Sequence, residues 1–327
     1  MKELIEAFPN DIRKAYEIAK THEIKKHDIQ FKNIVLCGLG GSGIGAKIIE
    51  NWAQSELCVP CVCVNEYNLP AFVSKDTLVI ATSYSGNTEE TIYSTKEAHD
   101  LGARIVGITS GGQLELFCKE NDYSCILIPP GNPPRSALAF SLMQLAYILN
   151  QLDLISDRII KSMLSSSDLL VSNKPNTHAL AKQVAQHLFG KVGIYYAETK
   201  YEGVVVRARQ QFNENSKYLG WHHVIPEMNH NELVGWSGGD KRFAPIFIET
   251  EDVSMRNKKR FDITKTAVKE KCGEIFTLQA FGSDIVERTL YCIHVLDWAS
   301  YYLCESNQAD IMDIKIIDYL KSELSKE

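Results

Sequence analysis

Three hydroxyl side chains stand close together in the segment Ser83-Tyr84-Ser85-Gly86-Asn87-Thr88, directly before a predicted helix. Ser83, Ser85 and Thr88 can each donate a hydrogen bond. The first turn of a helix adds free N–H groups and the positive end of the helix dipole. Together these groups would form a nest of neutral donors for three phosphate oxygens, although ordinary turn and cap residues are an alternative explanation. The segment therefore predicts a phosphate-binding loop.

A glycine-rich loop gives a second phosphate signal. The run Gly-Leu-Gly-Gly-Ser-Gly-Ile-Gly, residues 38–45, follows a short apolar strand and opens a helix. Its glycines let the backbone approach a ligand closely, and Ser42 adds a hydroxyl donor. The run also fits the G-x-G-x-x-G pattern of dinucleotide-binding proteins, with Glu66 near the expected ribose acid. A NAD-dependent dehydrogenase has no need of a hydroxyl nest after its third strand, so the two loops together favour a phosphorylated small molecule.

The two loops require strands that end at the same edge of a sheet. In the first half, short β-branched runs alternate with helical stretches, which predicts a parallel sheet covered by helices on both faces. The alternation restarts after a polar helical connection at residues 153–175. We expect an α/β protein with two doubly wound, flavodoxin-like parallel sheets. Residues 1–153 would hold an N-terminal helix and both phosphate loops, and residues 154–327 would end in a C-terminal helix.

Expected strands cover residues 33–37, 61–64, 77–82, 104–109, 124–128, 192–196, 222–226, 243–248 and 275–279. Expected helices cover residues 44–54, 88–101, 136–152, 177–189, 201–212, 258–271 and 284–305.

Composition limits the classes of partner. The 327 residues are 45% hydrophobic, and a net charge of −6 argues weakly against nucleic acid as the main partner. The sequence has no signal-peptide pattern and no apolar run that could span a bilayer, so we expect a cytoplasmic protein with reduced cysteines. Cys58, Cys61 and Cys63 lack a fourth ligand nearby, which favours positions on a buried strand over a zinc site.

The pair of loops resembles the sugar isomerase (SIS) domain, whose members bind phosphosugars through Ser/Thr loops of the second kind. Three further segments, residues 133–137, 212–217 and 226–232, resemble the bifunctional phosphoglucose/phosphomannose isomerases, and the resemblance covers nearly the whole chain. It implies an aldose–ketose isomerase that converts glucose 6-phosphate, and mannose 6-phosphate as a second substrate, to fructose 6-phosphate. The reaction would pass through a cis-enediolate and need no metal or nicotinamide cofactor.

The resemblance also implies the site residues. The phosphate would be bound by Gly41, Ser42, Ser83, Ser85 and Thr88. Arg135 would stabilise the enediolate oxygen with its permanent charge. Glu214 would take the proton from C2 and return it to C1, a task for a carboxylate whose pKa is raised by partial burial. His230 would protonate the ring oxygen from the partner subunit, which implies a homodimer.

The C-terminal helix, expected at residues 310–324, departs from the family pattern. Lys321 falls where the family has a lysine that assists the histidine at the ring oxygen. The proline-rich stretch before it is missing, and Ile314 replaces a threonine that is tied to the reaction of the mannose epimer. The preference between glucose and mannose therefore stays open, as does the choice between a catalytic and a solvated Lys321.

Other functions fit parts of the same sequence. A phosphosugar sensor would use the fold without catalysis, but no helix-turn-helix pattern lies outside the two halves. An isomerase of a different phosphosugar would share both loops. His222, His223 and His230 could be interpreted as metal ligands, although their spacing fits no usual zinc pattern.

Overall fold

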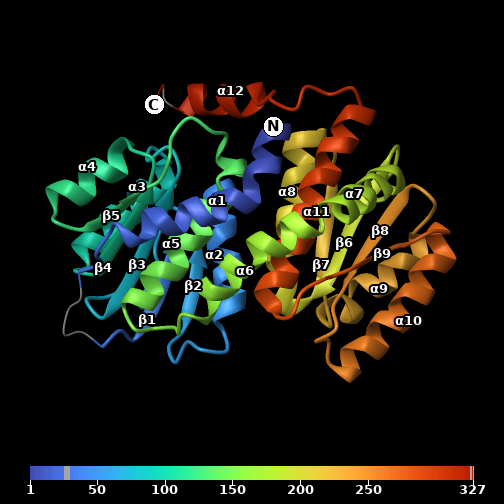
Figure 1. The fold of residues 1–327 in the computed structure, drawn as a ribbon, viewed down its shortest axis with the longest axis horizontal. Coiled ribbons are helices and arrows are strands. Elements are labelled where there is room, and N and C mark those ends of the chain that lie inside the picture. The colour runs from blue at the N-terminus through green and yellow to red at the C-terminus, as the bar shows by residue number, and fades with distance from the viewer. Residues whose placement is uncertain (26–29, 325, 327) are drawn as a thin grey trace.

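The structure is a computed structural model that describes residues 1–25, 30–324 and 326. Two parallel β-sheets lie side by side, and helices cover them and fill the space between them (Figure 1). The strand order is β2-β1-β3-β4-β5 in the first sheet and β7-β6-β8-β9 in the second. The strands are β1 (Asn33–Cys37), β2 (Cys61–Val64), β3 (Thr77–Ser83), β4 (Arg104–Thr109), β5 (Ser124–Leu127), β6 (Val192–Glu198), β7 (Gly220–Ile225), β8 (Phe243–Glu249) and β9 (Phe276–Gln279).

The helices follow the alternation that the sequence indicates, and the predicted α/β fold with two parallel sheets is confirmed. The α-helices are α1 (Lys2–Lys20), α2 (Gly40–Ala53), α3 (Glu89–Asp100), α4 (Gly112–Glu120), α5 (Leu138–Gln151), α6 (Arg158–Ser172), α7 (Lys174–Leu188), α8 (Glu202–Ser216), α9 (Glu232–Gly235), α10 (Met255–Cys272), α11 (Ile285–Ser306) and α12 (Lys315–Leu324). Short 3₁₀ turns include η1 (Pro134–Ser136), η2 (Thr199–Tyr201), η3 (Glu227–His230) and η4 (Trp236–Gly238).

Several elements differ from the expectations; the C-terminal helix α12, for example, begins at Lys315 rather than at residue 310. Helix α2 begins at Gly40 rather than at residue 44, because the glycine loop itself forms the first helical turn. Helix α4 was not expected; it is short, and only Leu114 and Cys118 on it are buried, so its apolar stripe is narrow. Strand β2 is an edge strand on which Cys61 and Cys63 are only partly buried, and Cys58 lies before the strand and is exposed, so the expectation of a buried strand for the three cysteines was wrong.

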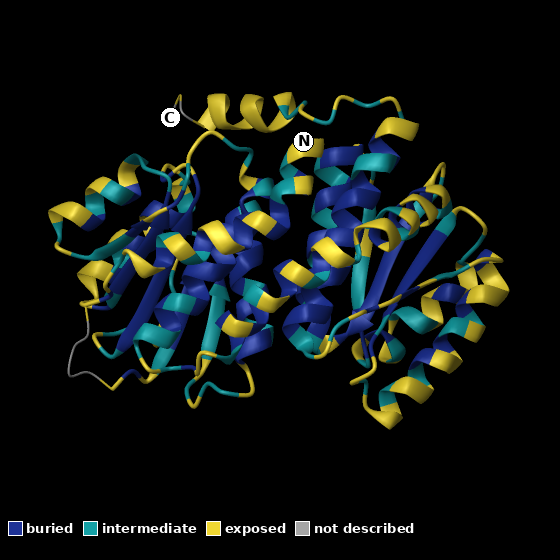
Figure 2. Cartoon of the chain, viewed as in Figure 1, coloured by how far each residue is buried: buried dark blue, intermediate teal, exposed yellow. Residues whose placement is uncertain are grey.

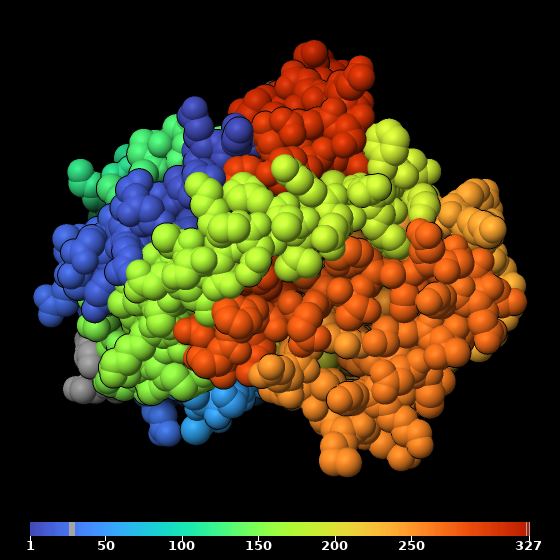
Figure 3. All heavy atoms as spheres, turned by 45° about the vertical axis from the view of Figure 1, so that its right-hand side comes forward, coloured from blue at the N-terminus to red at the C-terminus, as the bar shows by residue number. Residues whose placement is uncertain are grey.

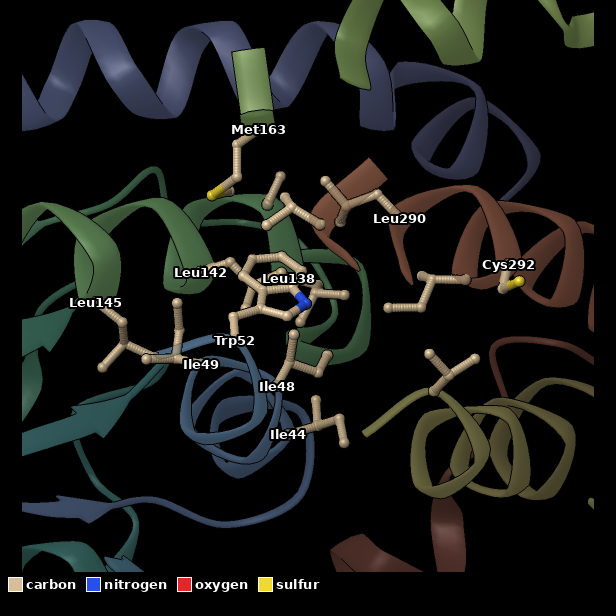
Figure 4. Packing of buried hydrophobic residues seen from close by; sticks show 14 of the residues in the cluster. Ile44, Ile48, Ile49, Trp52, Leu138, Leu142, Leu145, Met163, Leu290 and Cys292 are labelled. Atoms are coloured by element: carbon tan, nitrogen blue, oxygen red, sulfur yellow. The ribbon is translucent and has the colours of Figure 1, made fainter. Parts of the chain in front are cut away.

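One apolar cluster extends from the first sheet into the second, and smaller clusters lie on the outer sides of the sheets. Trp52 of α2 lies at its centre, surrounded by side chains from α2, α5, α6 and α11, as Figure 4 shows. Its ring nitrogen donates to Thr289 Oγ1 at 3.1 Å, which satisfies the one polar atom of the side chain. Each large side chain buried here contributes about 1.5–3 kcal/mol relative to exposure. The burial view shows the same continuity, with dark helices in the middle and an exposed α12 (Figure 2).

Helices α6 and α7 cross one face of the molecule between α1 and α11 (Figure 3). Helix α6 packs on both α1 and α11, so it belongs to the contact between the halves as much as to either half. The predicted boundary between residues 153 and 154 stays a prediction. No helix in the described part of the chain is long and apolar enough to cross a membrane.

Helices α2 and α8 run antiparallel where the two halves meet. Near the start of α8, the amide of Gly203 donates to Asn51 Oδ1 near the end of α2, at 3.1 Å. Near the end of α8, Gln210 shares a cavity of about 490 Å³ with Gly40 at the start of α2. The carboxyl edge of the first sheet, where α2 begins, therefore meets the amino edge of the second, where α8 ends.

Candidate active site

The hydroxyl loop after β3 has the geometry of a nest. Ser83 is fully buried, and its hydroxyl donates to Thr88 Oγ1 at 2.8 Å while accepting from the Thr88 amide at 3.3 Å. Ser85 is exposed, and its oxygen accepts from the Asn87 amide at 3.2 Å. Gly86 has φ +67, and a Cβ there would lie 1.7 Å from the Gly111 carbonyl oxygen, so the turn requires glycine.

The glycine loop after β1 lies against the hydroxyl loop. The amide of Tyr84 donates to Ser42 Oγ at 3.0 Å, which leaves the hydroxyl hydrogen of Ser42 free to donate elsewhere. The predicted phosphate residues thus come from two loops that touch at one edge of the first sheet. The two loops lie at the carboxyl ends of the neighbouring strands β1 and β3. The strand order changes direction between these two strands, and ligands usually bind at such a point in open α/β sheets.

Gly41 brings the next segment of the site into contact with these loops. A Cβ on Gly41 would lie 2.8 Å from the carbonyl carbon of Pro134 and 2.9 Å from the amide nitrogen of Arg135. Only a residue without a side chain permits this approach of η1 to the glycine loop. Arg135 is therefore fixed next to the two loops.

Arg135 joins the two halves of the chain. Its Nη1 atom lies 3.3 Å from Glu214 Oε2 near the end of α8, although the two residues are separated by 79 positions. The guanidinium side chain is 4% exposed, whereas the Glu214 side chain is 30% exposed. The carboxylate is therefore paired but still reachable from outside, as a group that exchanges a proton with a ligand must be.

Further hydrogen bonds hold the Arg135 guanidinium in place. Nε donates to Asn215 Oδ1 at 2.8 Å, and Nη2 donates to the carbonyl oxygen of Ile311 at 2.7 Å. Burial lowers the pKa of Arg135, and the charge and hydrogen bond of Glu214 oppose that change. The group remains a cation, because an arginine pKa starts far above neutrality.

His230 lies away from this cluster within one chain. It ends η3, which follows the carboxyl end of β7, whereas Glu214 lies near the end of α8, just before the amino end of β7. Strand β7 has six residues, a length of about 20 Å at 3.3 Å per residue. His230, which is exposed, and Glu214, which is partly exposed, thus lie at opposite edges of the second sheet.

Lys321 lies on α12, a helix on which no residue is buried. The segment before α12 reaches the site through the Ile311 carbonyl that accepts from Arg135. Within the part of the chain that the structure describes, no hydrogen bond or ion pair joins Lys321 to Arg135 or Glu214. Its role stays a prediction.

The structure adds residues that the sequence had not shown to matter. Asn215 is fully buried and bonds to both Arg135 and Ser300. The carbonyl of Ile311 could not be foreseen, since a main-chain oxygen carries no residue-type signal. Among residues 1–25, 30–324 and 326, no group of three His, Cys, Asp or Glu side chains is arranged to hold a metal ion.

Comparison with known proteins defines the class to which this fold and site belong. Residues 29–152 match the model of the SIS domain, and residues 177–324 match the model of the bacterial phospho-glucose isomerase C-terminal SIS domain. The chain is thus built from two SIS domains.

Curated relatives identify the family within that class. The chain is 35% identical to a bifunctional phosphoglucose/phosphomannose isomerase of Caldicellulosiruptor bescii, across 100% of this chain and 99% of the relative. A protein of the same name from Aquifex aeolicus is 33% identical over 95% of this chain and 96% of its own length. The chain therefore belongs to the bifunctional phosphoglucose/phosphomannose isomerase family. A D-glucosamine-6-phosphate 4-epimerase of Sulfolobus acidocaldarius is 32% identical over 68% of this chain and 70% of the relative.

Solved structures share the fold at low sequence identity. A hypothetical protein of Thermus thermophilus aligns with a TM-score of 0.74 at 16% identity and covers 98% of this chain and 89% of its own. The C-terminal domain of a glucosamine-fructose-6-phosphate aminotransferase of Francisella tularensis aligns with a TM-score of 0.71 at 14% identity and covers 95% of each chain. At this identity the likeness concerns the arrangement of two SIS domains.

Proposed function

We propose that this protein interconverts glucose 6-phosphate, and mannose 6-phosphate as a second substrate, with fructose 6-phosphate. Membership of the family supports this activity. The observation that carries the mechanism is the contact of Arg135 with Glu214, which joins a cation and a reachable carboxylate beside the glycine loop.

The phosphate docks on the two loops at the first sheet. Ser42, Ser85 and Thr88 offer hydroxyl donors, and the buried Ser83 orients Thr88 by donating to its hydroxyl oxygen. The first amides of α2 and α3 point outward from their helices. Gly41 lets the backbone come close to the sugar. Binding of the phosphate fixes one end of the substrate, so that its other end lies beside the Arg135–Glu214 pair.

The hydrogen transfer uses the second half. Glu214 takes the proton from C2 of the open-chain aldose, the C–H electron pair forms a C1–C2 double bond, and the carbonyl electrons move to O1. Arg135 faces the resulting enediolate with a charge that needs no reorganisation. A proton passes from O2 to O1, and Glu214 returns its own proton to C1, which yields the ketose.

Ring opening calls for a second copy of the chain. His230 is exposed and cannot reach Glu214 of its own subunit, because a whole strand lies between them. We therefore place His230 in the site of a partner subunit, as the family resemblance implies, with Lys321 of α12 as its assistant at the ring oxygen. The protein would work as a homodimer in the cytoplasm on a hexose phosphate, with neither nucleic acid nor membrane as partner.

Two assays test this function. Fructose 6-phosphate is supplied, and glucose 6-phosphate formation is followed through a coupled glucose-6-phosphate dehydrogenase; turnover is expected with and without a chelator. If neither glucose 6-phosphate nor mannose 6-phosphate is interconverted with fructose 6-phosphate while phosphosugars bind tightly, the protein is a non-catalytic phosphosugar sensor instead.

The shared site is tested with mixed dimers. Mixing Glu214→Gln and His230→Ala subunits under exchange conditions should restore activity, because one site of each mixed dimer then holds both Glu214 and His230. Failure to restore activity would contradict the shared site.

A second activity has one supporting observation, the similarity to the glucosamine-6-phosphate epimerase. The two loops would then bind the phosphate group of an amino sugar phosphate. Incubation with glucosamine 6-phosphate and analysis of the product by NMR separates a 4-epimer from a 2-ketose. Formation of the 4-epimer at a rate above that of hexose isomerisation would replace the proposed reaction.

A further inference from the structure

A buried ion pair lies behind the candidate site and has no part in the mechanism described above. Arg207 of α8 and Asp297 of α11 are 3% and 4% exposed, and the Nη2 and Oδ2 atoms are 2.7 Å apart. The same Nη2 donates to the carbonyl oxygen of Arg135 at 3.1 Å. One guanidinium of the second half thus bonds to the main chain of η1 in the first half.

Stability alone does not account for this pair. Removing two charges from water is costly, and a pair of well-packed apolar side chains of similar volume is often as stable or more stable. The pair is also incompletely satisfied: within the described residues, Arg207 Nε and Asp297 Oδ1 are buried without a hydrogen-bond partner. Apolar side chains, however, could not donate the hydrogen bond that Arg207 makes to the Arg135 carbonyl oxygen.

Residues of helix α8 bond to both the main chain and the side chain of Arg135. Arg207 and Glu214 are seven residues apart, about two turns, and so lie on the same face of the helix. Arg207 bonds to the main chain of Arg135, while Glu214 and Asn215 bond to its guanidinium. Asp297 neutralises Arg207, so that a second bare cation does not lie behind the first.

We propose that the Arg207–Asp297 pair is a positioning device: it fixes the main chain of Arg135 and thereby the direction in which the guanidinium meets the reacting carbons. This inference rests on the proposed isomerase function, because it assigns a task to a residue that acts through Arg135. Arg207 and Asp297 themselves touch no reacting atom.

The double variant Arg207→Met/Asp297→Leu removes both charges and leaves no unpaired ion in the core. We expect kcat for fructose 6-phosphate to fall by up to about 100-fold, as for a displaced catalytic group, while KM changes by less than about twofold because the phosphate grip is untouched. Arg288→Met is the matched control. Arg288, on α11, is likewise a buried arginine (8% exposed), but its ion pair is with Asp252. The kcat of the Arg288→Met variant should stay at the wild-type value.

A double-mutant cycle separates positioning from general destabilisation. In an Arg135→Met background, Arg207→Met/Asp297→Leu should cause little further loss of kcat, because the guanidinium to be positioned is gone. Equal factors of loss in both backgrounds would overturn the inference. A folded double variant with full activity would also overturn it.

Two further measurements keep the outcome decisive. If the double variant does not fold, Arg207→Lys takes its place, since lysine keeps a charge opposite Asp297 but its shorter side chain does not carry a donor as far as the Arg207 Nη2 atom that bonds to both Asp297 and the Arg135 carbonyl. Its loss of kcat must also vanish in the Arg135→Met background. An inactive wild-type protein would refute the proposed function, whereas an active wild type with an unaffected double variant refutes only the positioning role.

Discussion

The carboxyl edges of the two sheets have the same topology and opposite chemistry. In the first sheet, the gap between β1 and β3 is lined by glycines and neutral hydroxyls. In the second, the equivalent gap between β6 and β8 opens into a cavity of about 370 Å³ lined by Glu198, Glu249, Glu251 and Lys258 among others. Lys200 pairs with Glu198 at 3.2 Å, and Lys265 pairs with Glu249. A phosphate would meet carboxylates there, so only the first edge suits the anion.

The difference explains how two similar domains share one reaction. The second sheet contributes from its amino edge, where α8 ends and presents Glu214 to the first sheet. In the proposed mechanism, one copy of the fold binds the phosphate and the other supplies the general base.

The largest expected effect is at the carboxylate that the second half contributes. Glu214→Gln should lower kcat by about 10²–10⁴-fold, the usual contribution of a general base, and leave the Kd for fructose 6-phosphate within about twofold because the phosphate grip is intact. Steady-state kinetics and calorimetry measure the two quantities. Glu202→Gln, at the other end of α8, is the control. A Glu214→Gln enzyme of near-normal kcat would assign the base elsewhere.

The next effect is at the residue where the halves meet. Arg135→Met should lower kcat by about 10²–10³-fold, as for the loss of a donor to a developing oxyanion. Rates of exchange of the C2 hydrogen with solvent deuterium should fall with it, because the enediolate is less stable. Loss of substrate affinity with unchanged kcat would instead place Arg135 in phosphate binding.

A smaller effect is expected at the first edge itself. Ser85→Ala should raise the Kd for fructose 6-phosphate by about 10- to 100-fold, since its hydroxyl is exposed and a hydrogen bond to a charged group contributes about 1.5–3 kcal/mol. Inorganic phosphate, as a competitor, should lose affinity in proportion. Weaker binding of the sugar with unchanged affinity for phosphate would contradict the nest.

The smallest effect is expected at the second edge. Glu249→Gln removes a carboxylate from the cavity between β6 and β8 but leaves the first sheet untouched. Both kcat and KM should stay within about twofold of the wild-type values. A change in KM of tenfold or more would show that the two edges are not as different in function as their chemistry indicates.

The sequence predicted those features that depend on neighbours in the chain. The hydroxyl nest at Ser83 and the turn of Gly86 are local, and so residue types and spacing were sufficient. The contact of Arg135 with Glu214 joins positions 79 apart, and only the family resemblance pointed to both. Such a pairing depends on how α2 packs on α8, which no local pattern encodes.

The buried polar residues were the least predictable. Arg207 follows three valines and Asp297 lies within an apolar run, so each was a charged residue on an otherwise buried helix stretch. That signal is real but does not name a partner, since 90 positions separate the two. Asn215 is buried although its sequence neighbours are polar, so no local pattern indicates its burial.

In the proposed site, the close packing of α2 on α8 sets the distance between the phosphate and the base. A Cβ on Gly203 would lie 2.6 Å from Ile48 Cγ1, so the approach of the two helices requires glycine at this position. Helix α2 begins at the proposed phosphate loop and α8 ends at the proposed base, and their separation would therefore limit the length of the carbon chain between the two. Gly203→Ala would increase the separation of α2 and α8, and we therefore expect the ratio of kcat/KM for pentose phosphates to kcat/KM for hexose phosphates to fall. An unchanged ratio would mean that other contacts set the distance between the phosphate and the base.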